Sequence, residues 1–457
     1  MKDLSNLIVG NDFEVTLPDG RQLPYVYLDN GASTPALKSV QQKLEEFMPY
    51  YASIHRGSGF KSRLSTHIFE EARDIMRQFL GAPDDSMLAF TRNATESINM
   101  LAHYAAELPG DKVIISEAEH HANDLPWRDI AEVLRVPVDN DGIMDLEFLD
   151  RTLAQNEGRI KMVSLTGASN ITGAVPPCKL IGEIAHRHNT LIHIDAAQLA
   201  PHKPIDMVAS GIDFISISGH KMYAPYGSGV LVGPHDFFTT RSPLIEGGGC
   251  VEVVTTDTVM WAPPPERLEA GTPNVPGAVA IAQAARSLQQ IGFPTLEENE
   301  EELTQYILRE LEQIPEVRVI GHRAGREVSN RLGVISMMVG DLPHELVNAA
   351  LEFEHGIGTR GGCFCAHPYI IKVMDVDEAT VEEFTARIMK GDLTHRPGLV
   401  RFSLGLYNTM EEAERAVTAI RQISRRELAL DYEMHKDTGE YLPRGFEYNL
   451  EQYFRFE

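Results

Sequence analysis

The stretch "DFISISGHKMYAPYGSGVLVG" (residues 213–233) places a lysine between two apolar runs. Residues 213–218 and 229–233 are rich in large and β-branched apolar side chains, which is typical of short buried strands. Lys221 lies on the turn between them, where an amine is poorly solvated. Desolvation lowers the pKa of a lysine and favours its use as a nucleophile. The alternative, that the side chain extends outward into solvent, fits this stretch equally well.

Further apolar runs precede this stretch, and segments with helical spacing of apolar residues separate them. Residues 178–189 are such a segment, and a long helix is expected over residues 278–292. This alternation predicts an α/β fold with a mostly parallel sheet covered on both faces. Ligands of such folds bind beyond the carboxyl ends of the strands. Strands are expected at residues 112–116, 161–166, 190–195, 213–218 and 229–233.

The chain of 457 residues is too long for one small core and should divide into domains. Residues 259–277 are crowded with proline and glycine and are predicted to form a long loop. Beyond about residue 300 the pattern becomes helix, strand, helix, which indicates a smaller α+β domain. The acidic, aromatic C-terminal end is expected to pack on the body or on a second subunit. The predicted division is a segment 1–24 belonging to the small domain, a large domain 25–300, the small domain 301–425 and an extension 426–457.

The composition excludes several classes of protein. The content of 43% hydrophobic and 23% charged residues is that of a globular protein. The formal net charge of −25 argues against nucleic acid and anionic membrane surfaces as partners. No run approaches the roughly 20 apolar residues of a membrane span, and the N-terminus lacks a signal-peptide pattern. We therefore expect a cytoplasmic protein.

Polar groups follow the predicted strands. Ala94 and Thr95, in "RNATESIN" (residues 92–99), open a helix whose N–H groups, with the threonine hydroxyl, suit a phosphate. An ordinary helix N-cap explains the same turn. Asp195 ends the strand at 190–195, where a buried carboxylate is costly unless a cation meets it. Lys221 follows the next strand along the chain.

This combination predicts a pyridoxal 5′-phosphate (PLP) site. PLP requires a lysine amine, an acid that keeps its ring nitrogen protonated, and donors for its phosphate. A nicotinamide dinucleotide is less well supported, because no G-x-G-x-x-G joins a strand to a helix, and a P-loop is also missing.

The chain has four cysteines, too few and too scattered for a disulfide scaffold. Cys178 is expected to be structural, and Cys250 fits either a structural or a reactive role. Cys363 and Cys365 share "RGGCFCAHP" (residues 360–368), which is too sparse for a zinc site, and no metal is predicted. The neighbouring glycines, arginine and histidine indicate an exposed, electropositive loop of the kind that makes a thiol reactive.

Taken in order, these motifs resemble those of fold-type I, class V aminotransferase-like enzymes, and within them the cysteine desulfurases of the sulfur-mobilisation type and the related selenocysteine lyases. The resemblance runs from residue 27 to residue 417. It implies a seven-stranded, mostly parallel sheet, a smaller α+β domain and PLP bound in the large domain. The matching stretches are "HRGSGFKSR", "RNATESIN", "SEAEHHANDLPW", "GASNITGAVPP", "HIDAAQ", "SGHKMYAPYGSGVL", "EAGTPN" and "RGGCFCAHP".

The resemblance implies roles for individual residues. Lys221 matches the lysine that forms the Schiff base, and Asp195 matches the partner of the pyridine nitrogen. His120 matches the histidine that stacks on the ring and shuttles protons. Arg401 matches the clamp on the substrate carboxylate, and Cys365 matches the cysteine that becomes a persulfide.

The remaining implied contacts are with cofactor, substrate and partner. Thr272 matches a phosphate contact from the neighbouring subunit, which implies a homodimer. His55 shapes the substrate entrance in this interpretation, although a helix-capping role fits it about as well. The predicted cofactor contacts are Ala94, Thr95, His120, Asn170, Asp195, Gln198, Ser218, His220, Lys221 and Thr272, and the predicted substrate contacts are His55, Asn170, Arg360 and Arg401.

The predicted function is removal of sulfur from L-cysteine, which gives alanine and a persulfide on Cys365, with an acceptor protein as a further partner. His367 and the extra thiol of Cys363 depart from the family pattern and leave the nucleophile, substrate and sulfur acceptor open. The alternative is a class V C–S lyase, selenocysteine lyase or epimerase without a persulfide. A binding protein that has lost catalysis is disfavoured by the intact set of lysine, aspartate and phosphate donors.

Overall fold

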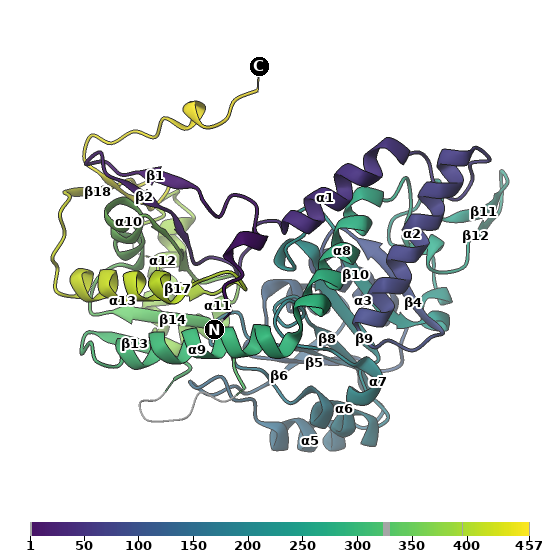
Figure 1. Cartoon of the computed structure of the whole chain (residues 1–457). Coiled ribbons are helices and arrows are strands. Elements are labelled where there is room, and N and C mark those ends of the chain that lie inside the picture. Colours follow the sequence, from purple (N-terminus) through teal and green to yellow (C-terminus); the bar gives the residue numbers. More distant parts are fainter. Residues whose placement is uncertain (1, 323–329, 395, 457) are drawn as a thin grey trace.

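The computed structural model describes residues 2–322, 330–394 and 396–456. Its centre is a seven-stranded sheet in the order β4-β10-β9-β8-β7-β5-β6, in the larger of two lobes (Figure 1). Within this sheet β10 runs antiparallel to both its neighbours and the other pairs are parallel. The predicted mostly parallel α/β fold is therefore confirmed. The strands are β4 (Ser86–Thr91), β5 (Lys112–Ser116), β6 (Glu132–Val136), β7 (Ile160–Thr166), β8 (Leu191–Asp195), β9 (Phe214–Ser218) and β10 (Gly229–Pro234).

Both faces of this sheet are covered because its strands are apolar at consecutive positions. Side chains of alternate residues enter different cores, as Ile114 and Ile115 of β5 show. One face packs on α1 (Lys38–Phe47), α2 (Phe60–Phe79), α5 (Leu146–Gln155), α6 (Cys178–Arg187) and α8 (Val275–Ile291). The other face packs on α3 (Ala94–Ala105) and α4 (Leu125–Arg128).

The smaller lobe is built on an antiparallel sheet in the order β13-β14-β17-β16. Its core also takes in Val26 and Leu28, next to the short parallel pair of β3 (Val26–Tyr27) and β15 (Ile357–Gly358). The strands of the sheet are β13 (Val317–Ile320), β14 (Val334–Val339), β16 (Arg360–Gly362) and β17 (Leu399–Ser403), and the helices are α9 (Phe293–Leu311), α10 (His344–His355), α11 (His367–Val373), α12 (Glu378–Ile388) and α13 (Met410–Ser424).

The predicted boundaries of the domains remain a proposal. Residue 300 lies inside α9, and residue 425 directly follows α13. The expected loop at 259–277 is shorter than predicted, since β12 (Val259–Trp261) pairs with β11 (Val251–Val254) and α8 begins at Val275. Proline at the start of α8 is compatible with a helix, because the first helical N–H groups have no intrahelical acceptor.

The C-terminal extension packs on the small lobe. Its hairpin joins β18 (Tyr432–Met434) to β19 (Tyr441–Pro443). Tyr432 donates to Glu354 of α10, and Phe446 packs on Phe353 of the same helix with ring centroids 5.1 Å apart. The last described residues extend away from the small lobe (Figure 1, yellow). Among the helices of the described chain, we find none long and apolar enough to cross a membrane.

Candidate active site

A cavity of about 360 Å³ lies beyond the carboxyl ends of β8 and β9. This is the position that the strand pattern predicts for a ligand site. The cavity brings together twelve of the predicted site residues from both lobes. They are Ala94, Thr95, His120, Asn170, Asp195, Gln198, Ser218, His220, Lys221, Arg360, Cys365 and Arg401.

Lys221 follows β9 on a short turn and directs its amine to the Oε1 atom of Gln198, at 3.1 Å. The residue as a whole is partly exposed, but its amine lies among buried groups. Desolvation lowers the pKa of the amine to about 8, although the negative charge of Asp195 opposes the shift. Roughly a tenth of this amine is therefore neutral at pH 7, far more than for an ordinary lysine, and a nucleophile or a base requires that form.

Asp195 ends β8 with 6% of its surface exposed. Its carboxylate accepts one backbone hydrogen bond, from Ala197 at 3.0 Å. Burial raises the pKa of Asp195, while this hydrogen bond and the charge of Lys221 oppose the shift. A buried carboxylate with so few donors is stabilised by a cationic partner, such as a protonated ring nitrogen.

His120 faces the same cavity as a neutral imidazole. Burial and the nearby charge of Lys221 lower its pKa to about 3. Its Nδ1 accepts a hydrogen bond from the backbone N–H of Ala122 at 3.1 Å, so the single ring proton resides on Nε2. The neutral ring can therefore donate one hydrogen bond, from Nε2.

Glu119, which the sequence analysis missed, positions the loop that carries His120. Its buried carboxylate accepts hydrogen bonds from the side chains of Ser116 and Asn123 and from the backbone of Thr166. Burial nevertheless raises the pKa of Glu119 to about 7. The loop is thus tied to the ends of β5 and β7. In the sequence, the position of Glu119 directly before the two histidines was a signal that could have indicated this role.

The N-terminus of α3 forms one wall of the cavity. The side chain of Asn93 caps the helix by accepting from the N–H of Glu96, and the N–H of Ala94 donates to Ser218 Oγ at 2.8 Å. Thr95 is exposed at the first helical turn. Burial lowers the pKa of His220 to about 4, so this histidine is neutral. The wall therefore offers a helix N-terminus, hydroxyl groups and an imidazole, all suited to a phosphate.

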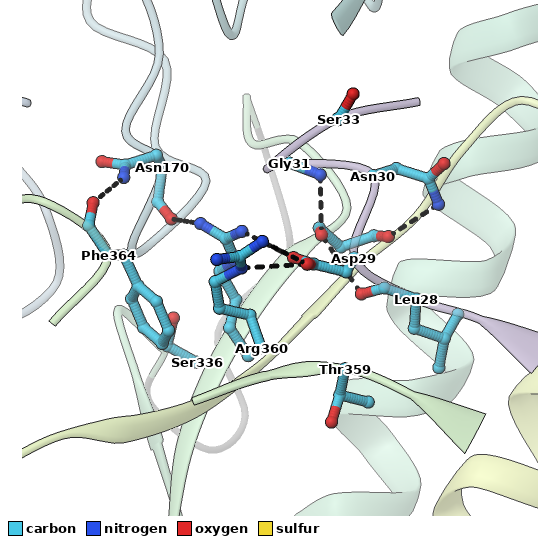
Figure 2. Close-up of polar contacts among 12 residues, drawn as sticks. Leu28, Asp29, Asn30, Gly31, Ser33, Asn170, Ser336, Thr359, Arg360 and Phe364 are labelled. Carbon is cyan, nitrogen blue, oxygen red and sulfur yellow. Dashed lines mark hydrogen bonds and ion pairs between the residues drawn. The ribbon is translucent and has the colours of Figure 1, made fainter. Parts of the chain in front are cut away.

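Two arginines reach the cavity from the small lobe and share Asp29 (Figure 2). Arg401 Nη2 lies 3.0 Å from Asp29 Oδ1, and Arg360 Nη2 lies 2.8 Å from Asp29 Oδ2. Arg401 also donates from Nη1 to the carbonyl oxygen of Asn170 at 3.1 Å. Its buried Nε has no hydrogen-bond partner among the described residues. One N–H of Arg401 therefore has no acceptor within the described chain. The sequence analysis did not assign a role to Asp29.

The loop that carries the two adjacent thiols is anchored to the large lobe. The N–H of His121 donates to the carbonyl oxygen of Cys365 at 2.7 Å, and Asn170 Nδ2 donates to that of Phe364 at 2.8 Å (Figure 2). Both Phe364 and Cys365 adopt positive φ angles, of 49° and 55°. These contacts fix the exposed Cys365 at the wall of the Lys221 cavity.

Cys363 lies outside the Lys221 cavity. Its thiol donates to the carbonyl oxygen of Pro397 at 3.0 Å. Burial raises the pKa of the Cys363 thiol to about 11, so it is almost entirely protonated near neutral pH. The geometry thus separates the two thiols, which the sequence alone could not do.

Thr272 and His55 line a different cavity, of about 540 Å³, within the single chain. His55 is held by Glu70, with Nε2 3.1 Å from Oε1, and this contact raises the pKa of the histidine. Thr272 is exposed on the same cavity. The structure of one chain therefore keeps both predicted residues apart from Lys221.

The cavity contains a lysine, a buried acid and a helix N-terminus that suits a phosphate, all near the carboxyl ends of the strands. This arrangement is typical of the PLP-dependent enzymes of fold type I. In agreement, the family model described as Aminotransferase class-V matches residues 26–416, and the chain belongs to this family.

Individual relatives agree with this assignment. The chain is similar to a probable cysteine desulfurase of Vibrio cholerae, with 33% identity over 87% of this chain and 93% of that protein. A probable cysteine desulfurase of Streptomyces coelicolor is 35% identical over 78% of this chain and 86% of that protein. Among solved structures, the apo cysteine desulfurase of Thermococcus onnurineus aligns with a TM-score of 0.79 and 30% identity, over 93% of this chain and 99% of that one.

Proposed function

We propose that the protein is a PLP-dependent cysteine desulfurase, which converts L-cysteine to alanine and leaves the sulfur as a persulfide on Cys365. The single observation that carries this proposal is that Lys221 and Cys365 line one cavity, together with the unpartnered Nε of Arg401. A base, a sulfur nucleophile and a carboxylate site are the three elements that this reaction requires of the protein.

The residues of the cavity fit PLP. Lys221 would hold it covalently, Asp195 would meet its ring nitrogen, and His120 would lie against its ring. Its phosphate would be held at the start of α3 by Thr95, Ser218 and His220, with Asn170 and Gln198 toward the ring hydroxyl. When bound, PLP supplies the electron sink that stabilises negative charge at the substrate α-carbon.

Arg401 and Lys221 orient and deprotonate the substrate in this proposal. The free N–H of Arg401 binds the α-carboxylate, a charge-assisted interaction strengthened by burial. The Lys221 amine accepts the α-proton, for which its lowered pKa of about 8 is suited.

Cys365 then takes the sulfur. Its thiolate attacks the sulfur atom of the substrate, so a Cys365 Sγ–S bond forms while the substrate C–S bond breaks. The electrons of the broken bond remain on the former substrate carbon, which is protonated to give alanine. No external oxidant or reductant is consumed, because the sulfur is oxidised to the sulfane level while the substrate carbon is reduced from C–S to C–H.

Two further parts of the proposal concern the assembly and its location. We infer a homodimer in which Thr272, and His55 with it, reach the Lys221 cavity of the partner subunit. The cavity that both line is separate from Lys221 in one chain, which supports such sharing.

The four cysteines are unpaired, as in a reducing compartment, and we therefore keep the cytoplasm as the proposed location.

The test is a single-turnover reaction of the holoenzyme with L-cysteine, in which alanine, sulfide and pyruvate are measured and persulfide is located by mass spectrometry. We expect alanine and added sulfur on Cys365, both lost in Cys365→Ser, whereas the matched Cys363→Ser variant retains them. Pyruvate as product, or full turnover by Cys365→Ser, would instead establish the C–S lyase alternative.

A further inference from the structure

A second cavity, of about 580 Å³, lies on the other side of the thiol-bearing loop. Phe364 and Cys365 line both this cavity and the Lys221 cavity. Cys363 lines this second cavity and not the Lys221 cavity. Its other walls come from α10, α12, β16 and the C-terminal extension. Cys365 therefore stands between two cavities, one with the lysine and one without.

The second cavity is lined by a buried histidine, one ring nitrogen of which has no hydrogen-bond partner in the described chain. His344 at the start of α10 is 8% exposed. Its Nε2 donates to the carbonyl oxygen of Arg396 at 3.2 Å, so Nδ1 of the neutral ring is an acceptor. Burial lowers the pKa of His344 to about 4, which keeps the ring neutral. Within the described chain Nδ1 has no hydrogen-bond partner, a state that costs free energy unless a ligand or water supplies a donor.

The Asn348 amide fills the space beside this atom that a side chain at position 361 would need. A Cβ at this position would lie 2.8 Å from His344 Nδ1 and would collide with Asn348 Nδ2. The Oδ1 atom of Asn348 is already bonded to Thr359, at 2.9 Å. The missing side chain of Gly361 therefore lets a donor, Asn348 Nδ2, and an acceptor, His344 Nδ1, lie together against the strand that leads to Cys365.

Charges of both signs line the same cavity. Glu345 and Glu352 extend from α10, and Arg396 precedes β17. Glu440 of the extension adds a further carboxylate. The carboxylates complement an ammonium group, and the guanidinium complements a carboxylate. A molecule that carries both groups is matched better than a neutral or singly charged one.

The extension turns this surface into a cavity. Thr438, Gly439, Glu440, Tyr441 and Leu442 form one wall and Tyr448 adds to it. The wall is fixed because Glu354 of α10 accepts from the backbone N–H groups of Ala429 and Leu430. This segment lies beyond residue 416, where the family match ends. The resulting volume is of the order that holds a small ligand, roughly 300–1,000 Å³.

We propose that the second cavity binds a small zwitterionic thiol, of the size of cysteine or of a short cysteine-containing peptide, which accepts the sulfur from Cys365. The inference rests on the proposed function, since it needs the persulfide. The carboxylate of the acceptor binds Arg396 and Asn348, its ammonium group binds Glu345 and His344 Nδ1, and its thiol faces Cys365.

The transfer itself is a balanced exchange. The thiolate of the acceptor attacks the terminal sulfur of the Cys365 persulfide. A new S–S bond forms on the acceptor as the S–S bond of the enzyme breaks, and Cys365 leaves as a thiolate. The proton of the acceptor thiol passes to solvent. The sulfane sulfur keeps its oxidation level throughout, so neither an oxidant nor a reductant is consumed.

The experiment follows the persulfide of Cys365 by mass spectrometry after a single turnover with limiting L-cysteine. The holoenzyme is then mixed with glutathione, a zwitterionic peptide thiol, or with neutral 2-mercaptoethanol at equal thiolate concentration. We expect discharge by glutathione to saturate and discharge by 2-mercaptoethanol to rise linearly. Arg396→Ala should slow discharge by subsaturating glutathione about 10-fold, the loss of one charge-assisted hydrogen bond, and leave the rate with 2-mercaptoethanol unchanged.

The control is Arg425→Ala, since Arg425 is exposed and outside both cavities. It should leave both rates unchanged. Linear discharge at equal rates by the two thiols, unaffected by Arg396→Ala, would overturn the inference, as would a persulfide that glutathione does not discharge. A holoenzyme that forms no persulfide at all would instead contradict the proposed function, so the two failures are distinguishable.

Discussion

Asp29 forms a buried ion pair with Arg401, whose Nη2 lies 3.0 Å from the carboxylate. The two side chains are 10% and 2% exposed. A second arginine, Arg360, binds the other carboxylate oxygen from a more exposed position. The cavity therefore holds two guanidinium groups around one carboxylate, and the excess positive charge favours binding of a second anion, the substrate carboxylate.

Replacing Asp29 by Asn should destabilise the apoprotein and make it more responsive to carboxylates. Removing one partner of a buried ion pair leaves an uncompensated charge, which costs about 3–5 kcal/mol of the free energy of unfolding. Propionate, which supplies a carboxylate without an amine, should raise the melting temperature of Asp29→Asn more than that of the natural protein. Urea unfolding and calorimetry with and without propionate measure both effects.

The control for this prediction is Asp111→Asn. Asp111 pairs with Arg159, but both side chains are more than half exposed. An exposed pair contributes at most about 1 kcal/mol. Equal losses of stability in the two variants would show that the buried pair of Asp29 and Arg401 contributes no more to the free energy of unfolding than an exposed pair.

The sheet and the main site residues were predictable because they depend on local patterns. The strands β5, β7, β8, β9 and β10 lie within one residue of the predicted ranges, since short apolar runs bounded by polar turns specify buried strands. Asp195 is the last residue of β8 and Lys221 lies three positions after β9, so the strand ends placed them at one edge of the sheet.

Residues whose partners are distant in sequence were not predictable. Asp29 meets Arg401 across 372 positions of the chain, and no local pattern reports such a contact. Glu119 is buried by elements that come together only in the fold. The different surroundings of Cys363 and Cys365 arise in the same way, because the carbonyl group that binds Cys363 belongs to Pro397.

Capture of PLP by the apoenzyme should follow the titration of Lys221. Only the neutral amine attacks a carbonyl carbon, and desolvation lowers the pKa of this lysine from 10.5 to about 8. The rate of capture should therefore rise with pH up to about pH 8 and then level off. Stopped-flow absorbance of apoenzyme mixed with PLP from pH 6 to pH 10 measures this profile.

Gln198→Glu provides the matched test of the same assignment. The Oε1 atom of Gln198 lies 3.1 Å from the Lys221 amine, and a carboxylate at that distance favours the ammonium form. The midpoint of the capture profile should move upward by about one pH unit or more. A natural rate that still rises at pH 10, and that the substitution does not change, would mean that the amine is solvated like an ordinary lysine.

Alkylation should distinguish the two neighbouring thiols. Cys363 has a pKa of about 11 and donates to Pro397, so at pH 7.5 it is almost entirely the unreactive thiol. Cys365 is exposed at the cavity wall. One equivalent of iodoacetamide should therefore modify Cys365 first, as peptide mapping will show. Preferential modification of Cys363 would reverse the assignment of the nucleophile.

Mixed dimers should recover activity if Thr272 completes the site of the partner subunit. Lys221→Ala and Thr272→Ala would each abolish or strongly reduce turnover alone. In a mixed dimer, however, one of the two sites combines the intact lysine of one subunit with the intact threonine of the other. Random exchange of equal amounts makes half of the dimers mixed, so about a quarter of the natural activity should return. The measurement is alanine formation after subunit exchange, with sedimentation used to establish the dimer. A mixture no more active than the separate variants, in a preparation shown to exchange subunits, would place Thr272 outside the partner's site.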